Sequence, residues 1–302
     1  MNVITNDHGP GKLATKVFIA SESGFNVTST IVMGQEECII IDTQWTRANA
    51  LRVIAEVIET GLKVKAVYVT HAHPDHYWGL GEIAAAFPEA KCYAPEPVVT
   101  LYHHQYQPKL DEWEERIGSG NLCRRQCDRL EPLKDTYLEL DGERLEIIRC
   151  MGDLMWNTMV WIPSIRTAVC SDVVFNQAHP FTCEVSRKQR MLWMKDIEGI
   201  RALDPEVVIP GHMKDDLSLD MSSLDFMEQY LIATEEEIDG CADAPEFFYH
   251  MFKRFPEATL LALSNEMNAE VFKGGREWSW GEDPDPKWLE FPTAWLTEPD
   301  VD

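Results

Sequence analysis

The chain has 302 residues, of which 45% are hydrophobic and 26% are charged, as in a folded globular protein. Its 51 acidic and 27 basic residues give a net charge of −24 at pH 7, which repels the phosphates of nucleic acids and of anionic lipids. No run of about 18 apolar residues occurs, so we expect no membrane-spanning helix. We therefore expect a small-molecule substrate, with neither nucleic acid nor membrane as a partner.

The start of the chain and its cysteines indicate a cellular location. Residues 1–12 have neither a basic start nor an apolar run, so we expect no secretory signal. The eight cysteines are scattered along a long chain, which favours reduced thiols over a disulfide framework. We therefore expect a cytoplasmic protein.

The first half of the chain alternates strands with helices. Strands are predicted at 16–20, 28–33, 38–42, 64–70 and 91–94, and a short helix at 82–87. Residues 47–60 are predicted as an amphipathic helix, because Leu51, Ile54 and Ile58 recur on one stripe and Gly61 follows its end.

The second half repeats this layout and ends in a further helical part. Strands are predicted at 137–140, 145–149, 159–163, 168–171 and 207–209, with a helix at 188–203. Each half has several strands, then a helix, then a strand that ends at a histidine. Sheets covered by helices on their outer faces are the expected packing.

The chain is divided into a main domain and a C-terminal extension. Residues 1–215 form the main domain, with 98–130 as a polar and aromatic helical insertion. Residues 216–302 form a helical extension and a tail with four tryptophans, Trp278, Trp280, Trp288 and Trp295. Because tryptophan is costly to expose, we expect the tail to pack on the same domain or on a second subunit, which makes a homodimer possible.

The strongest chemical signal is the segment His-Ala-His-Pro-Asp-His at 71–76, directly after a predicted strand. In extended chain, residues two apart point the same way, so His71 and His73 can bind one metal ion. Asp75 and His76 follow a turn and can point toward a second position. Three histidines and a carboxylate so close together at a strand end indicate a metal site.

This H-x-H-x-D-H motif resembles that of the metallo-β-lactamase superfamily, and the resemblance covers most of residues 16–215. Asp42 resembles the family's aspartate that lies near the metal centre and orients the motif loop. Asp172 resembles the aspartate that bridges two metals, and His212 resembles the last histidine ligand. The resemblance implies an α/β fold, namely a four-layer αββα sandwich, here with helical C-terminal additions.

One position departs from the family pattern. The family usually has Gly-His-Thr before the strand that precedes the bridging aspartate, whereas this chain has Gly152, Asp153 and Leu154. Either Asp153 is a ligand itself, since carboxylates bind zinc, iron and manganese, or the loop is displaced and the first metal has only two histidines. A third carboxylate would lower the Lewis acidity of the metals and favour harder ions.

The resemblance implies one or two divalent ions per chain, with zinc favoured and iron or manganese possible. The implied ligands are His71, His73 and Asp153 for the first ion, Asp75, His76 and His212 for the second, and Asp172 between them. Asp75 is also implied to hold the attacking water and accept its proton.

Aromatic residues near these ligands indicate a substrate cleft. The residues expected to line it are Trp45, Trp78, Trp156, Phe175 and His179. An aromatic cleft suits a largely apolar substrate. His179 is either a substrate contact and proton donor or an ordinary polar loop histidine.

Together these features predict a metal-dependent hydrolase. We expect a metal-bound hydroxide to attack an ester, lactone, thioester or amide bond of a neutral, partly apolar substrate. Two alternatives use the same scaffold: a di-iron oxygenase or redox enzyme, and a metal-binding member whose altered third motif has cost it catalysis. No basic cluster or glycine-rich phosphate loop supports phosphate chemistry.

Overall fold

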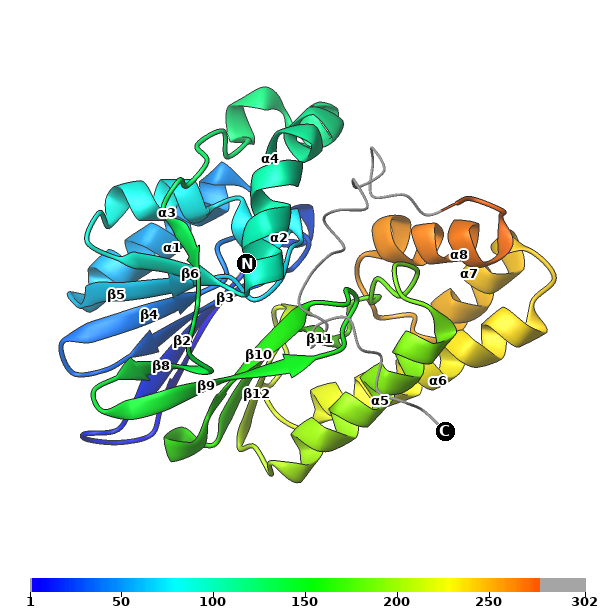
Figure 1. The fold of residues 1–302 in the computed structure, drawn as a ribbon. Helices are drawn as coiled ribbons and strands as arrows, with labels where there is room; N and C mark the ends of the chain where they lie inside the picture. Colours follow the sequence, from blue (N-terminus) through cyan, green and yellow to red (C-terminus); the bar gives the residue numbers. More distant parts are fainter. Residues whose placement is uncertain (1, 278–302) are drawn as a thin grey trace.

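The computed structural model describes residues 2–277 as two stacked β-sheets with helices on both outer faces (Figure 1). The first sheet has the strand order β1 (Asn2–Asp7), β2 (Ala14–Ile19), β3 (Thr28–Met33), β4 (Glu37–Ile41), β5 (Lys63–Tyr68), β6 (Lys91–Ala94) and β7 (Leu130–Pro132). The second has the order β12 (Val207–Met213), β11 (Thr167–Asn176), β10 (Asn157–Ile162), β9 (Glu143–Cys150) and β8 (Tyr137–Leu140).

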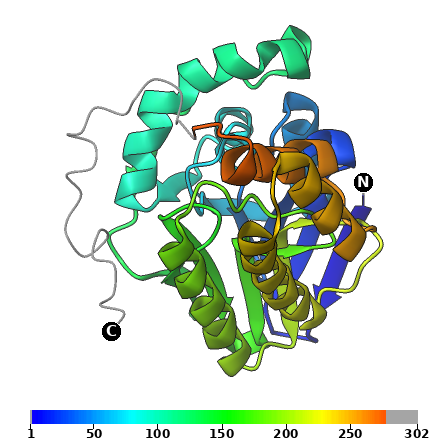
Figure 2. The same ribbon diagram turned by 90° about the vertical axis from the view of Figure 1, so that its right-hand side faces the viewer.

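The helices complete four layers. The first sheet is covered by α1 (Arg47–Thr60), α3 (Leu80–Ala86) and α4 (Glu96–Ile117), and the second by α5 (Arg187–Ala202) and α6 (Ser222–Gly240). Beyond α6, α7 (Ala244–Arg254) packs on it, and α8 (Glu266–Lys273) packs on α7 (Figures 1 and 2). The predicted αββα sandwich is therefore confirmed.

The hydrophobic core consists of three buried layers, because side chains along a strand point alternately to its two faces. On β4, Ile39 and Ile41 belong to the cluster between the sheets, whereas Cys38 and Ile40 belong to the cluster under α1 and α3. Because successive strand residues point to opposite faces, a strand covered on both sides has to be apolar throughout. This accounts for the unbroken apolar run in the sequence.

Helix α1 shows how the sequence sets the ends of an element. Thr46 caps its start by accepting a hydrogen bond from the Asn49 amide at 3.3 Å, and Gly61 ends it in the left-handed conformation. The predicted apolar stripe is wrong in part, because Leu51 and Ile58 are 46% and 64% exposed. The buried stripe instead consists of Ala50, Val53, Ile54 and Val57.

Strands β11 and β12 are longer than the sequence predicts, and this difference shapes the site. The sequence predicts that β11 ends at the polar pair Ser171 and Asp172, but the strand continues to Asn176 across two register shifts against β12. Ser171 has a φ of +47°, so the strand kinks there and resumes. Strands β1 and β7 and the short helix α2 (Pro74–Tyr77) are additional to the predicted elements.

The C-terminal extension packs on the second sheet. Leu224, Met227 and Tyr230 of α6 share a buried cluster with Val174 of β11. Trp278 and the other tail tryptophans lie outside the described residues. Within residues 2–277 no helix has both the length and the apolar character needed to cross a membrane. The homodimer and the cytoplasmic location stay predictions.

Gly79 provides a test of the packing between the motif segment and the end of β4. A Cβ added at Gly79 would fall well inside van der Waals contact with the Thr43 carbonyl oxygen. Gly79→Ala should therefore lower the free energy of unfolding by about 2 kcal/mol, measured by urea titration. Gly199→Ala, where a Cβ meets open space within α5, is the control and should be neutral or stabilising. Equal stability of the two variants would contradict this packing.

Candidate metal centre

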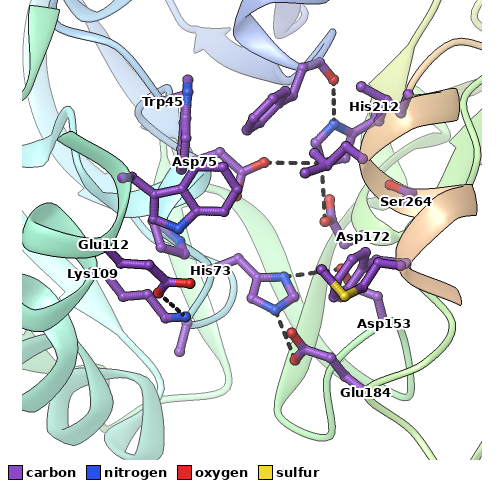
Figure 3. A pocket seen from close by; sticks show the side chains of 18 of the residues that line it. Trp45, His73, Asp75, Lys109, Glu112, Asp153, Asp172, Glu184, His212 and Ser264 are labelled. Atoms are coloured by element: carbon purple, nitrogen blue, oxygen red, sulfur yellow. Dashed lines mark hydrogen bonds and ion pairs between the residues drawn. The ribbon is translucent and has the colours of Figure 1, made fainter. Parts of the chain in front are cut away.

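Two groups of histidine and aspartate side chains meet after the end of β5, at the kink within β11 and near the end of β12. Figure 3 shows five of these residues, His73, Asp75, Asp153, Asp172 and His212. The first group is His71, His73, Asp153 and Asp172, and the second is Asp75, His76 and His212. Within each group the potential ligand atoms lie within 4.8 Å of one another. The fold thus brings together all of the metal ligands that the sequence indicates.

Asp172 touches both groups. Its Oδ2 lies 3.5 Å from His71 Nε2 and 3.2 Å from His212 Nε2, and its Oδ1 lies 3.1 Å from His76 Nε2. Gly211 makes room for it, since a Cβ there would overlap Oδ1 of Asp172. One carboxylate between two sets of imidazoles is the arrangement expected of a bridging ligand.

Asp153 lies at the position where the resemblance leads us to expect a histidine. Its Oδ2 lies 3.0 Å from Nδ1 of His73, and its Oδ1 accepts a hydrogen bond of 3.0 Å from Nδ2 of Asn157. Its backbone amide donates to the carbonyl of Asp172 at 3.3 Å. The loop is therefore held against β11, and its carboxylate faces the first group, which favours the interpretation of Asp153 as a ligand.

The buried carboxylate of Asp42 orients two of the histidines. It accepts hydrogen bonds from the Thr70 amide, the Ser171 hydroxyl and His76 Nδ1, each at 2.9 Å. The Thr70 hydroxyl also donates to the Asp42 carboxylate. The Thr70 Oγ1 atom can then accept a hydrogen bond from His71 Nδ1, which lies 3.0 Å away. With Nδ1 protonated in both rings, the lone pair of each Nε2 points into the site.

The other two histidines are oriented in the same way by different acceptors. His212 Nδ1 donates to the carbonyl oxygen of Phe25 at 2.7 Å, which leaves Nε2 for the site. His73 Nε2 donates to Oε2 of Glu184 at 3.1 Å, which leaves Nδ1 facing Asp153. In all four rings, one nitrogen contacts an acceptor outside the site and the other faces the same small space, where it can hold a proton or a metal ion.

These residues fit divalent metal ions. Nε2 of His71 is fully buried and has no hydrogen-bond partner among the described residues, as expected of an atom placed to bind a cation. Imidazole nitrogens and carboxylate oxygens are the ligands that zinc, iron and manganese accept.

The charges in the site also indicate that it binds cations. Burial disfavours the charged form of His212, but Asp172 and Asp75 outweigh it and raise its pKa to about 10. Burial and the neighbouring His76 lower the pKa of His71 to about 4, and burial raises that of Asp153 to about 7. Protons and metal ions thus compete for the same atoms, so metal uptake releases protons.

A cavity of about 300 Å³ opens over these groups (Figure 3). Its floor consists of His73, Asp75, Asp153, Asp172 and His212. One wall comes from α4, with Gln105, Lys109, Glu112, Trp113 and Arg116, and another from the segment around α8, with Leu260, Leu263, Ser264 and Met267. Phe25, Trp45, Phe175 and Phe181 add an aromatic lining.

Of the predicted substrate residues, only Trp45 and Phe175 line this cavity. The expectation for the other three is wrong. Trp78 is fully buried behind Trp45, with the ring centroids 4.6 Å apart, and Trp156 lies in the core under the helices. The extra length of β11 carries His179 away from the cavity.

His179 is instead a buried residue of the interface with α6. Its Nδ1 lies 2.8 Å from the Tyr230 hydroxyl, and its amide donates to the carbonyl of Thr259. Burial lowers its pKa to about 4, so the ring is neutral at pH 7. The structure favours the ordinary interpretation of this histidine, because the ring is buried and does not line the cavity.

Glu184 and Trp113 are site residues that sequence reasoning missed. Glu184 reaches His73 from the loop before α5, and Trp113 enters from α4. Neither belongs to a motif with recognisable spacing. The only signal in the sequence is the aromatic character of the insertion, which holds Trp113.

The chain matches the family model described as the metallo-beta-lactamase superfamily over residues 23–212. It belongs to this superfamily. Among solved structures, a metallo-beta-lactamase family protein from Thermus thermophilus superposes with a TM-score of 0.60 at 18% identity, covering 90% of this chain and 92% of that one. A metallo-beta-lactamase from Pontibacter korlensis gives a TM-score of 0.58 at 17% identity, over 76% and 99% of the two chains.

Two kinds of curated relatives match shorter segments. A hydroxyacylglutathione hydrolase of Vibrio cholerae is 36% identical over 69 residues, which is 22% of this chain and 26% of that protein. A linear primary-alkylsulfatase of a Pseudomonas species is 21% identical over 213 residues, which is 60% of this chain and 40% of that protein. The chain thus matches less than half the length of these relatives.

The position of Asp153 predicts its effect on metal content. Asp153→Ala should lower metal occupancy, because it removes an oxygen that faces His73, whereas Asp153→His should retain it. Metal content of the purified proteins is the measurement, with circular dichroism to verify the fold. The exposed Asp135→Ala is the control. If Asp153→Ala keeps full occupancy, the displaced-loop interpretation is correct.

Glu184 is predicted to act through His73. Glu184→Ala should weaken metal binding about tenfold, since Nε2 of His73 loses its acceptor, while Glu184→Gln keeps an acceptor oxygen and should bind nearly as the parent does. Competition with a chromophoric chelator measures the affinity. Glu112→Ala, which lines the same cavity without contacting a histidine, should change nothing. Equal affinities for all three variants would remove Glu184 from the centre.

Proposed function

We propose that this protein is a metal-dependent hydrolase that cleaves an ester, lactone, thioester or amide bond of a partly apolar substrate. The observation that carries the proposal is the pair of ligand groups sharing Asp172 at the floor of an aromatic cavity. The names of the relatives, a hydroxyacylglutathione hydrolase, an alkylsulfatase and several beta-lactamases, support hydrolysis as the class of reaction.

Each ligand group has an assigned place in this proposal. His71, His73 and Asp153 would hold one ion and Asp75, His76 and His212 another, with Asp172 between them. One or two divalent ions, zinc most readily and iron or manganese as alternatives, would supply the Lewis acidity that activates water and polarises the carbonyl.

Asp75 is the carboxylate best placed to orient the water. It lines the cavity, and its Oδ2 lies 3.3 Å from His212 Nε2. Burial would raise its pKa, but His76 and His212 outweigh burial and lower it to about 2. Asp75 is therefore ionised at neutral pH and can accept a hydrogen bond from a water at the cavity floor.

The aromatic wall would hold the apolar part of the substrate beside this water. Trp45 lies against Phe25, with centroids 4.6 Å apart, and meets Trp113 edge-on at 4.9 Å. Phe175 stacks on the His212 ring at 4.9 Å and 6°. Rings fixed by one another lose little freedom on binding, so they can position an acyl group accurately.

A second candidate, an iron-dependent oxygenase, is favoured by one observation. Asp153 adds a carboxylate to the first group, and oxygen-rich sites prefer harder ions than zinc. Protein purified without added metal distinguishes the candidates, because bound iron with oxygen consumption supports the second and bound zinc with acyl hydrolysis supports the first.

The hydrolase proposal predicts turnover of an aryl ester or a hydrophobic lactone. A chelator should abolish the activity, divalent metal should restore it, and a phosphodiester should not be cleaved. His73→Ala should lose metal and activity but keep its circular dichroism spectrum. Trp113→Leu should raise KM several-fold with a smaller effect on kcat, because it removes binding surface rather than reacting groups. Chelator-sensitive cleavage of a phosphodiester without any acyl turnover would overturn the proposal.

A further inference from the structure

A second cavity adjoins the first on the side away from the metal ligands. Its volume is about 660 Å³. The two cavities meet at five side chains that line both of them, Phe25, Trp45, Trp113, Arg116 and Leu263. These side chains form the boundary between the two cavities, so a molecule longer than the first cavity has to extend along this aromatic wall to reach the second.

The second cavity differs in charge from the rest of the protein. About one residue in six of the whole chain is Asp or Glu, yet none of the fifteen residues that line this cavity is acidic. Two of them, Arg52 and Arg116, are arginines, and Ser21, Ser23 and Asn49 add neutral polar groups. A cavity that is free of carboxylates in so acidic a chain favours an anion.

The two arginines have no carboxylate partner among the described residues. Nη1 of Arg52 donates to Oδ1 of Asn49 at 2.8 Å, and the guanidinium of Arg116 lies over the Trp113 ring, 4.9 Å from its centroid. Both arginines are exposed, and each of these contacts leaves most of the guanidinium N–H groups open. A guanidinium without a carboxylate partner is suited to bind a carboxylate, sulfonate or phosphate.

The charged side chains at the rim of the first cavity do not form a comparable anion site. Lys109 is paired with Glu112 at 3.0 Å, and Arg276 and Glu277 bring opposite charges to one edge. The unbalanced positive charge nearest the aromatic wall is therefore that of Arg116, which faces both cavities.

Resting on the proposed function, we propose that the substrate is an elongated acyl compound with an anionic group remote from the bond that is cleaved. The acyl bond lies over Asp75 and Asp172, the apolar part lies against Trp45 and Trp113, and the anionic group binds in the second cavity at Arg52 and Arg116. This replaces the neutral substrate expected from the net charge, because the local charge of the cavity decides binding at such short range.

Binding of non-hydrolysable probes tests the anion site independently of catalysis. The probes are an arylalkyl sulfonate and the neutral alcohol of the same length, with the carboxylate and phosphate analogues to rank the anions. Quenching of tryptophan fluorescence reports their affinity. The parent protein should bind the sulfonate about tenfold more tightly than the alcohol, and the preference should shrink as salt is added.

Substitution of the arginines assigns the preference to this cavity. Arg116→Gln and Arg52→Gln should each remove most of the preference for the sulfonate and leave binding of the alcohol unchanged. Arg47→Gln is the matched control, since it lies on the same helix as Arg52 but pairs with Glu82 outside both cavities. A preference that is absent, or that survives both substitutions, overturns the proposal.

Kinetics with matched esters separate this inference from the proposed function. Two aryl esters that share an acyl chain, one ending in a carboxylate and one in an amide, should differ mainly in KM, and the difference should vanish in Arg116→Gln. If the parent protein hydrolyses neither ester but keeps the preference for the sulfonate, the hydrolase proposal fails while the anion site stands. If it hydrolyses both equally, the hydrolase stands and the anion site fails.

Discussion

The arrangement of the whole site depends on one buried carboxylate. Asp42 follows β4, yet its two oxygens contact groups from three other parts of the chain: the Thr70 amide and hydroxyl after β5, His76 in the short helix of the motif, and Ser171 at the kink of β11. It thereby joins the two sheets at the point where they carry the ligands. A buried carboxylate is costly unless its acceptors are used, so these contacts are held in a single arrangement.

The second constraint is charge. Asp42, Asp75, Asp153, Asp172 and Glu184 are all buried or nearly so around four histidines. Carboxylates so close together are tolerated only if cations lie among them, and the raised pKa of His212 shows that protons can fill that role. A metal ion offers a stronger and more localised positive charge in the same place. The histidine rings are already oriented to bind such an ion.

Features that depend on neighbouring residues could be predicted from the sequence, whereas features that depend on contacts between distant segments could not. The motif at 71–76 is local, and Asp172 and His212 lie on recognisable strands, so the grouping of these side chains was predictable from the sequence alone. The place of Trp78 was not, because α2 begins within the motif and Trp78, its C-cap, is turned into the core. His179 was misjudged for a related reason, since the length of β11 depends on pairing with β12 through a kink that no sequence pattern marks.

Glu184 and the arginines of the second cavity were missed because their role depends on residues that are distant in the sequence. Glu184 lies 111 residues from His73 in the chain, and Arg52 and Arg116 come from different helices on the outer face of the first sheet. In a chain of net charge −24, the sequence around a single arginine gives no sign of an anion site. Only the fold shows that two of them line a cavity without carboxylates.

The stacking of Phe175 on His212 limits how the site of this protein can change over evolution. The ring that borders the cavity also supports an imidazole at the floor, in nearly parallel contact. A smaller residue at Phe175 would enlarge the cavity but would free that imidazole to tilt. New specificities are therefore more accessible through the α4 wall, where Trp113 borders the cavity without contacting a histidine of the centre. Gln105 of the same helix is an exception, because its Nε2 donates to the Ala72 carbonyl between His71 and His73. Diversification should concentrate in that helix, while the strand side stays constant.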